Sequence, residues 1–305
     1  MTEVEFFFVD VFTREPLAGN PLAVVSDADA LTDDEMRRLA REFNQSETTF
    51  VMKPSRTDAD WRLRFFTTTG EEVYGAGHNA LGAWWWLADS RRLPIPDDID
   101  RSRPRVLSFA QEIGTRVLPV DVLFESGQPS AIGMTQTAPV FGRVHRDPAR
   151  LASALRIRQE DLVVDRQDPQ VVSTGVAHLM VAVTDRATVA RVRPDGDELV
   201  SAVRAAGGQG CYVFALDPID PAATAHARFF NPGVGIAEDP ATGSAAGPLA
   251  CYLTSRGVVA AGKTVVVEQG HLAGRPSRIE VRVDGERVQV WGSAVVVGRG
   301  RMTIA

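Results

Sequence analysis

Two segments of the chain predict helices that are apolar on every side. One covers residues 83–88 and contains three consecutive tryptophans; the other covers residues 245–253. A helix without a polar face has to be enclosed by other elements of the protein. Short segments with the composition and period of strands lie before and after both helices. The two helices therefore predict two structural units, each with a sheet around one central helix.

An internal repeat indicates that the two units are related. The triplet Arg-Phe-Phe occurs at residues 64–66 and at residues 228–230, and each copy precedes a glycine turn and one of the apolar helices. A shared order of strand, glycine turn and enclosed helix is typical of a duplicated unit. We expect an α+β fold with two pseudo-symmetric domains, each a barrel-like mixed or antiparallel sheet around a central apolar helix. The expected domains are residues 1–127, completed by the C-terminal strand, and residues 128–305, joined by a Gly/Pro/Ser-containing link at 126–130.

The composition is that of a globular protein and argues against several functions. The 305 residues are 44% hydrophobic and 24% charged, and the net charge of −6 is spread along the chain. Nucleic-acid binding would need a clustered basic face. No apolar run approaches the roughly 20 residues that span a bilayer, and no signal peptide is visible. The sequence predicts a cytoplasmic protein that binds neither nucleic acid nor membrane.

The two cysteines, Cys211 and Cys251, belong to no CxxC pair and to no Cys/His metal spacing. Cys211 lies in a strand-like segment and Cys251 in the second apolar helix. We expect both to be small buried hydrophobic residues and not nucleophiles, disulfide partners or metal ligands.

The glycines that precede the two helices, Gly77 and Gly243, predict anion-binding positions. A helix N-terminus offers free backbone N–H groups and the positive end of the macrodipole. Two such ends facing each other would hold a carboxylate and stabilise negative charge on the adjacent carbon after a proton leaves. Acid–base side chains are then needed at the same point. The candidates are His78 and Asp239, beside the turns, and Glu47, in a polar bridge between a helix and a strand.

Each candidate also has an interpretation without function. Glu47 could be a solvated surface carboxylate, His78 a first-turn helix residue and Asp239 the start of a turn. Ser244 is either the N-cap of the second apolar helix or a contact to substrate. The residue pattern alone leaves these alternatives open.

At these residues the chain resembles the PhzF-like family of the diaminopimelate epimerase fold, named for the isomerase of phenazine biosynthesis. Single matching segments are short, but their ordered set runs almost from end to end. The matching segments are residues 10–13, 19–25, 44–48, 76–78, 172–175 with 178–179, 238–245, 269–270 and 274–277.

The resemblance implies an active site between two pseudo-symmetric domains, no cofactor or metal, and a homodimer. It implies that Glu47 is the general acid/base that removes a proton from carbon and returns one elsewhere, assisted by His78 and Asp239. The implied substrate is a small carboxylate-bearing molecule, and the family name points to one similar to trans-2,3-dihydro-3-hydroxyanthranilate. The residues expected to bind it are Asn20, Gly77, Asn79, Gly243, Ser244 and Ala245.

Departures from the family pattern leave the substrate open. They occur at Thr67-Thr68, Tyr74-Gly75 and Asn79, which line or adjoin the expected pocket. Isomerase and epimerase outcomes therefore both remain possible. Related amino-acid racemases carry paired cysteines near the two helix starts, and the absence of cysteine there argues against a two-thiol racemase.

Three competing functions are less well supported. Residues 75–80 fit the dinucleotide pattern G-x-G-x-x-G/A of an NAD-dependent oxidoreductase, but they do not directly follow a buried apolar strand. A serine hydrolase built on Ser244 would lack the glycines of a nucleophile elbow. A substrate-binding protein of the same fold without turnover would not need the acid–base set. Because that set is present, the sequence predicts an isomerase or epimerase.

Overall fold

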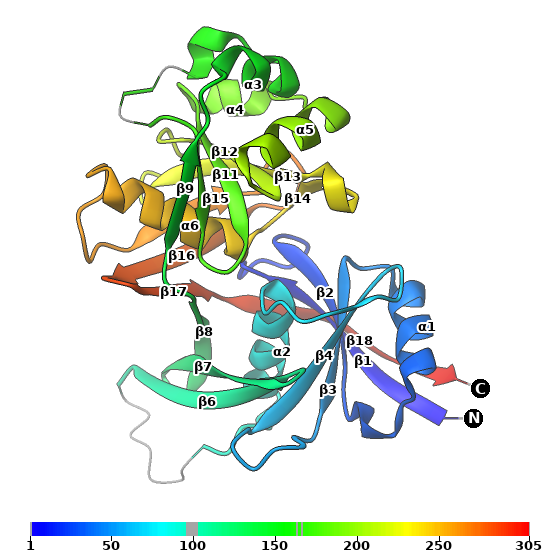
Figure 1. Ribbon diagram of the computed structural model, residues 1–305. Helices are drawn as coiled ribbons and strands as arrows, with labels where there is room; N and C mark the ends of the chain where they lie inside the picture. Colours follow the sequence, from blue (N-terminus) through cyan, green and yellow to red (C-terminus); the bar gives the residue numbers. More distant parts are fainter. Residues whose placement is uncertain (1, 96–102, 163, 166, 305) are drawn as a thin grey trace. The chain divides into compact units, whose positions relative to one another are not determined.

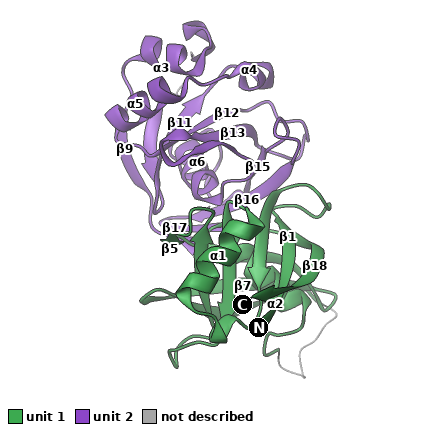
Figure 2. Cartoon of the chain, turned by 90° about the vertical axis from the view of Figure 1, so that its right-hand side faces the viewer, with its two compact units in different colours: residues 1–134, 291–305 green, residues 135–290 purple. Residues whose placement is uncertain are grey.

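The computed structural model describes residues 2–95, 103–162, 164–165 and 167–304 (Figure 1). The strands form mixed sheets with few helices, which confirms the α+β class. The chain divides into two compact units, residues 1–134 with 291–305 and residues 135–290 (Figure 2). Among the described residues, no helix combines the length and apolar character required to cross a membrane.

The first unit is a mixed sheet in the order β8-β7-β6-β4-β3-β2-β1-β18. The pairs β2–β3 and β4–β6 are parallel and the other neighbours are antiparallel. Strand β1 pairs with β18 from Thr2 opposite Ile304, so the two ends of the chain lie side by side. The elements are β1 Thr2–Val11, β2 Asn20–Val25, η1 Ala28–Ala30, α1 Asp33–Phe43, β3 Glu47–Met52, β4 Trp61–Thr67, β5 Glu72–Val73, α2 His78–Asp89, β6 Arg105–Ile113, β7 Arg116–Glu125, β8 Gln128–Gln136 and β18 Ala294–Ile304.

The second unit repeats this order as β17-β16-β15-β13-β12-β11-β10-β9. Its parallel pairs, β11–β12 and β13–β15, occupy the same places in the order as those of the first unit. The elements are β9 Val140–Val144, α3 Pro148–Leu155, η2 Gln159–Leu162, β10 Gln170–Ser173, β11 Ala177–Ala182, α4 Arg186–Arg191, α5 Gly196–Ala206, β12 Gly210–Ala215, β13 Ala225–Asn231, η3 Pro232–Val234, β14 Ile236–Asp239, α6 Gly243–Ser255, β15 Val265–Gln269, β16 Ser277–Asp284 and β17 Arg287–Gly292.

The repeat also includes side-chain contacts of the two Arg-Phe-Phe triplets. Arg64 donates to both carboxylate oxygens of Glu72 at 2.7 and 2.8 Å, and its guanidinium lies 5.1 Å from the ring of the last Phe of its triplet. Arg228 donates to both carboxylate oxygens of Glu238 at 2.9 and 2.7 Å, and lies 4.8 Å from the corresponding ring. The equivalent strands β4 and β13 therefore carry the same arginine–glutamate ion pair.

A second pair of equivalent contacts joins β4 to β6 in the first unit and β13 to β15 in the second. In the first unit Arg62 lies 3.7 Å from the buried carboxylate of Glu112; in the second, His226 lies 3.3 Å from that of Glu268. Both glutamates also accept hydrogen bonds from backbone N–H groups of a loop. For Glu112 the loop precedes β4, and for Glu268 it precedes β13. These contacts anchor equivalent loops, so the His226–Glu268 pair has a structural explanation.

The two central helices are enclosed, as their composition predicts. In α2, Leu81, Trp84 and Trp86 are at most 2% exposed, and in α6, Leu249 and Leu253 are fully buried. Burial of such residues removes large apolar areas from water and stabilises both units. In Figure 1 the sheet of the first unit curves around α2.

The stretch expected to link the domains is a hairpin turn. Glu125 pairs with Gln128 across Ser126 and Gly127, whose φ angles are 51° and 75°. Positive φ at both central residues matches the twist of a two-residue hairpin. As a result β8 continues the first sheet, and the compact units divide at 134/135, not at the predicted 127/128.

Candidate functional site

Glu47 and His78 meet in the first unit. Glu47 is the first residue of β3 and His78 the first residue of α2. A Glu47 carboxylate oxygen lies 3.7 Å from His78 Nδ1, and the two side chains are 25% and 13% exposed. This distance is a close contact and is too long for a hydrogen bond. Two residues 31 positions apart, proposed separately from the sequence, are thus neighbours.

His78 is a neutral imidazole at physiological pH. Burial lowers its pKa from 6.5 to about 4. Its Nε2 lies 3.3 Å from Ser46 Oγ, so the ring is flanked by a hydroxyl on one side and the Glu47 carboxylate on the other. The sequence interpretation did not single out Ser46, although it lies in the matching segment that contains Glu47.

The start of α2 is shaped by Asn79, whose side chain is 1% exposed. Its Oδ1 accepts from the N–H groups of Gly77 at 2.7 Å and Ala80 at 2.8 Å, and its Nδ2 donates to the Gly75 carbonyl at 2.9 Å. The buried Asn79 side chain therefore stabilises the turn before α2 through these hydrogen bonds. In this structure the Gly77 N–H is engaged with Asn79, and contact of either residue with substrate stays a prediction.

Three other expected substrate-binding residues lie in the interiors of their units. Asn20 begins β2 and is 2% exposed. Gly243 begins α6, and its carbonyl accepts from Gln136 Nε2 at 3.0 Å. Ala245 is fully buried and its N–H donates to the Thr242 carbonyl at 3.1 Å. Their predicted role in binding substrate is not tested by these contacts.

Asp239 ends β14 in the second unit, four residues before the start of α6. Its carboxylate accepts a hydrogen bond from the Thr242 hydroxyl. Thr242 occupies the N-cap position of α6. Ser244 is thus the second residue of the helix and is not its N-cap, which removes one of the alternatives left open by the sequence.

Ser244 contacts a histidine that was not proposed as a site residue. His178 Nε2 lies 3.4 Å from Ser244 Oγ, and burial lowers the His178 pKa to about 4. His178 belongs to one of the segments that carry the family resemblance, and that match could have identified it as a candidate site residue. Its Nδ1 has no hydrogen-bond partner among the described residues. A Ser–His pair without a carboxylate behind the histidine lacks the third member of a hydrolytic triad.

The cysteines behave as predicted. Cys211 is fully buried and Cys251 is 3% exposed, and burial raises their pKa values to about 12 and about 11. Thiols held in the neutral form are poor nucleophiles. Within the described residues, no group of three or more His, Cys, Asp or Glu side chains is placed to hold a metal ion.

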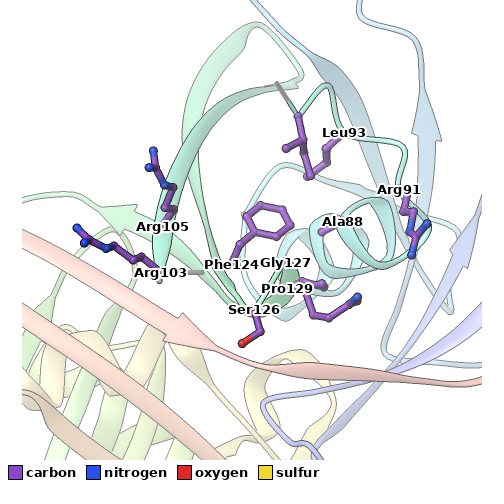
Figure 3. A pocket seen from close by; sticks show the side chains of 11 residues that line it. Ala88, Arg91, Leu93, Arg103, Arg105, Phe124, Ser126, Gly127 and Pro129 are labelled. Atoms are coloured by element: carbon purple, nitrogen blue, oxygen red, sulfur yellow. The ribbon is translucent and has the colours of Figure 1, made fainter. Parts of the chain in front are cut away.

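A cavity of about 270 Å³ lies at the far end of α2, away from its N-terminus (Figure 3). Phe124 lies inside it, with Arg103 and Arg105 on one side and Arg91 on the other. None of the predicted site residues lines this cavity. The cavity is therefore separate from Glu47, His78 and Asp239.

Comparisons with known proteins give the family. The PhzC-PhzF family, described as phenazine biosynthesis-like protein, matches residues 9–300. An uncharacterized isomerase of Clostridium acetobutylicum is 35% identical, with 97% of each chain covered. The trans-2,3-dihydro-3-hydroxyanthranilate isomerase of Pseudomonas aeruginosa is 33% identical over 97% of this chain and 98% of its own.

Solved structures agree with this assignment. The Bacillus anthracis phenazine biosynthesis protein of the PhzF family superposes with a TM-score of 0.87 at 28% identity and covers all of both chains. A hydroxyproline epimerase from Agrobacterium vitis, 11% identical, shares the fold alone, with a TM-score of 0.61 over 98% of this chain and 92% of its own. The chain belongs to the PhzC-PhzF family of phenazine biosynthesis-like proteins.

Proposed function

We propose that this chain is an isomerase that moves a proton on a small carboxylate-bearing substrate, with Glu47 as the general acid and base and without a cofactor. The relatives named above are isomerases, which supports the reaction class. The observation that carries the residue assignment is the contact between Glu47 and the neutral imidazole of His78 at the start of α2.

Glu47 has the properties of a base that exchanges its proton with a substrate. Its position at the start of β3 fixes its backbone by pairing with Thr67, while the side chain is one quarter exposed. A carboxylate in this setting takes a proton from a carbon atom and, once protonated, delivers it to another carbon. One residue thereby serves as base in the first step and acid in the second.

Because His78 is neutral, the Glu47 carboxylate remains available to act as a base. A protonated imidazole at 3.7 Å would form an ion pair with the carboxylate and weaken it as a base. Because the pKa of His78 is about 4, that ion pair is absent near neutral pH. The neutral ring can still hold a substrate oxygen or nitrogen through one of its two nitrogen atoms.

The two helix starts supply the positive potential that a substrate carboxylate requires. At α2, the Gly77 and Ala80 N–H groups are used by Asn79, so we assign carboxylate binding to the N–H groups of His78 and Asn79. At α6, the corresponding groups are those of Gly243 and Ser244. In this proposal Asp239 and the Ser244 hydroxyl assist the proton transfer.

The specific substrate proposed is trans-2,3-dihydro-3-hydroxyanthranilate or a close relative of it. The support is the name of the Pseudomonas aeruginosa relative, which is one third identical over nearly the whole chain. The experiment is proton NMR in D2O with the purified protein and this compound, followed by a panel of small amino and hydroxy acids. A new double-bond position with deuterium at the receiving carbon supports the proposal.

The panel separates the alternatives. Deuterium exchange with another acid, but not with the named compound, keeps the proton-transfer function and changes the substrate. Binding seen by calorimetry, without exchange on any compound, identifies instead a binding protein of the same fold. The homodimer implied by the family resemblance remains a proposal, and sedimentation analysis of the purified chain measures it directly.

A further inference from the structure

A buried hydrogen-bond network lies behind Asp239 and reaches strands β12 and β15. The Gln269 side chain, fully buried, is at its centre. Gln269 Oε1 accepts from the Tyr212 hydroxyl at 2.8 Å and from the Thr242 backbone N–H at 3.2 Å. Gln269 Nε2 donates to the Asp239 backbone carbonyl at 2.7 Å and to Thr242 Oγ1 at 2.9 Å. Thr242 Oγ1 then contacts an Asp239 carboxylate oxygen, Oδ2.

The direction of every bond in this network is fixed by two backbone groups. The Thr242 N–H can only donate, so it has to face the oxygen of the Gln269 amide. The Asp239 carbonyl can only accept, so it has to face the amide nitrogen. The amide is therefore held in a single orientation. Its four hydrogen-bonding positions are all used, two as acceptor and two as donor.

The orientation of the amide determines where the hydroxyl hydrogens point. Because Gln269 Oε1 is an acceptor, Tyr212 donates its hydrogen to it. Burial and the charge of Asp239 both raise the pKa of Tyr212, so the phenol keeps that hydrogen. Because Gln269 Nε2 is a donor, Thr242 Oγ1 accepts from it, and the Thr242 hydrogen goes to Asp239 Oδ2.

We infer that Tyr212, Gln269 and Thr242 are positioning residues that hold the Thr242 hydroxyl as a permanent hydrogen-bond donor to Asp239 Oδ2, and so orient the Asp239 carboxylate and stabilise its ionised form. The inference rests on the proposed function, since it specifies how a proposed acid–base residue is held. A hydrogen bond donated to an ionised carboxylate favours the ionised form over the protonated one.

A purely structural role has different consequences. The bonds from Gln269 to the Asp239 carbonyl and from the Thr242 N–H to Gln269 brace the turn between β14 and α6 whatever the Asp239 side chain does. If bracing were the whole function, removing the Thr242 hydroxyl would lower stability and leave turnover per folded molecule unchanged.

The test compares Thr242→Val, which removes the hydroxyl at nearly constant volume, with Thr242→Ser, which retains it. Loss of a hydrogen bond to a charged group is expected to lower kcat about 10- to 100-fold in Thr242→Val with little change in KM. Thr242→Ser is expected to retain most of the activity. Tyr212→Phe removes one of the hydrogen bonds to the Gln269 amide oxygen and is expected to lower kcat by a smaller factor. Wild-type kcat in folded Thr242→Val would overturn the inference.

A double-mutant cycle with Asp239→Asn tests whether Thr242 acts through Asp239. If it does, adding Thr242→Val to Asp239→Asn causes no further loss of kcat. An equal fold-loss in both backgrounds would show that Thr242 acts independently and would contradict the inference.

A measurement without substrate separates this inference from the proposed function. The 13C signal of the Asp239 carboxyl is followed by NMR as the pH is varied. Removing a donor from the carboxylate is expected to move its titration to higher pH in Thr242→Val and not in Thr242→Ser. This result can be obtained even if no compound is turned over, and coincident titration curves in all three proteins would overturn the inference by itself.

Discussion

Replacement of Arg228 by methionine is expected to destabilise the second unit severely. Arg228 has a side-chain exposure of 7%, and its guanidinium makes two hydrogen bonds to Glu238. It also donates to the backbone carbonyls of Val189 at 3.0 Å and Val192 at 2.8 Å. Methionine fills part of the volume but leaves one carboxylate and two carbonyls without these donors.

The magnitude follows from these contacts. Breaking a buried ion pair by removing one partner costs about 3–5 kcal/mol. Arg64, the equivalent residue of the first unit, is the matched control, because its partner Asp33 is 57% exposed and can be rehydrated. In the described structure, the hydrogen bonds of Arg64 go to the carboxylates of Glu72 and Asp33. Arg64→Met is therefore expected to cost less, about 1–3 kcal/mol.

Urea denaturation with two probes measures both variants. All five tryptophans, at positions 61, 84–86 and 291, lie in the first unit, so tryptophan fluorescence reports on that unit. Far-UV circular dichroism reports on both. Arg228→Met should shift the circular dichroism transition to lower urea by more than Arg64→Met does. Equal shifts, or a smaller shift in Arg228→Met, would refute the reasoning from the two carbonyls.

Two further predictions concern stability. Burial lowers the pKa of His178 from 6.5 to about 4, so below pH 6.5 the unfolded chain binds a proton that the folded one does not. Stability should therefore fall as the pH drops from 6.5 to 4, and thermal unfolding of His178→Gln should show a shallower fall; an unchanged slope would contradict this. Gly133→Ala should destabilise the first unit by about 1–3 kcal/mol in urea, because its Cβ would lie 2.5 Å from the Trp291 ring. Gly75→Ala, with no atom within 4 Å of the added Cβ, is its control, and equal midpoints would refute the packing argument.

Much of the fold could be predicted because its largest signals are local. The apolar helices around Trp84 and Leu249 show no polar face, and only enclosure satisfies such a pattern. The two Arg-Phe-Phe triplets marked equivalent strands because each arginine pairs with a glutamate of the next strand in its unit. The domain division was harder, because Ser126 and Gly127 have the composition of a linker and the geometry of a hairpin turn.

The candidate site was predictable in part. Glu47, His78 and Asp239 came from the family resemblance and from their places beside helix starts. The use of Asn79 as an internal brace was not visible, because an asparagine in the first turn has the same sequence pattern whether it faces inward or outward. Gln269 could not be connected to Asp239 from the sequence, since the two are 30 residues apart and meet only when β15 is placed.

The most direct test of the account is the rate at which Glu47→Gln catalyses deuterium exchange on the substrate in D2O. Glu42→Gln is the matched control, because Glu42 is an exposed residue near the end of α1 in the same unit. Loss of a general acid/base is expected to reduce the rate about 10²- to 10⁴-fold in Glu47→Gln. Glu42→Gln should exchange at the wild-type rate. Equal exchange by the two variants would show that Glu47 is not the residue that moves the proton.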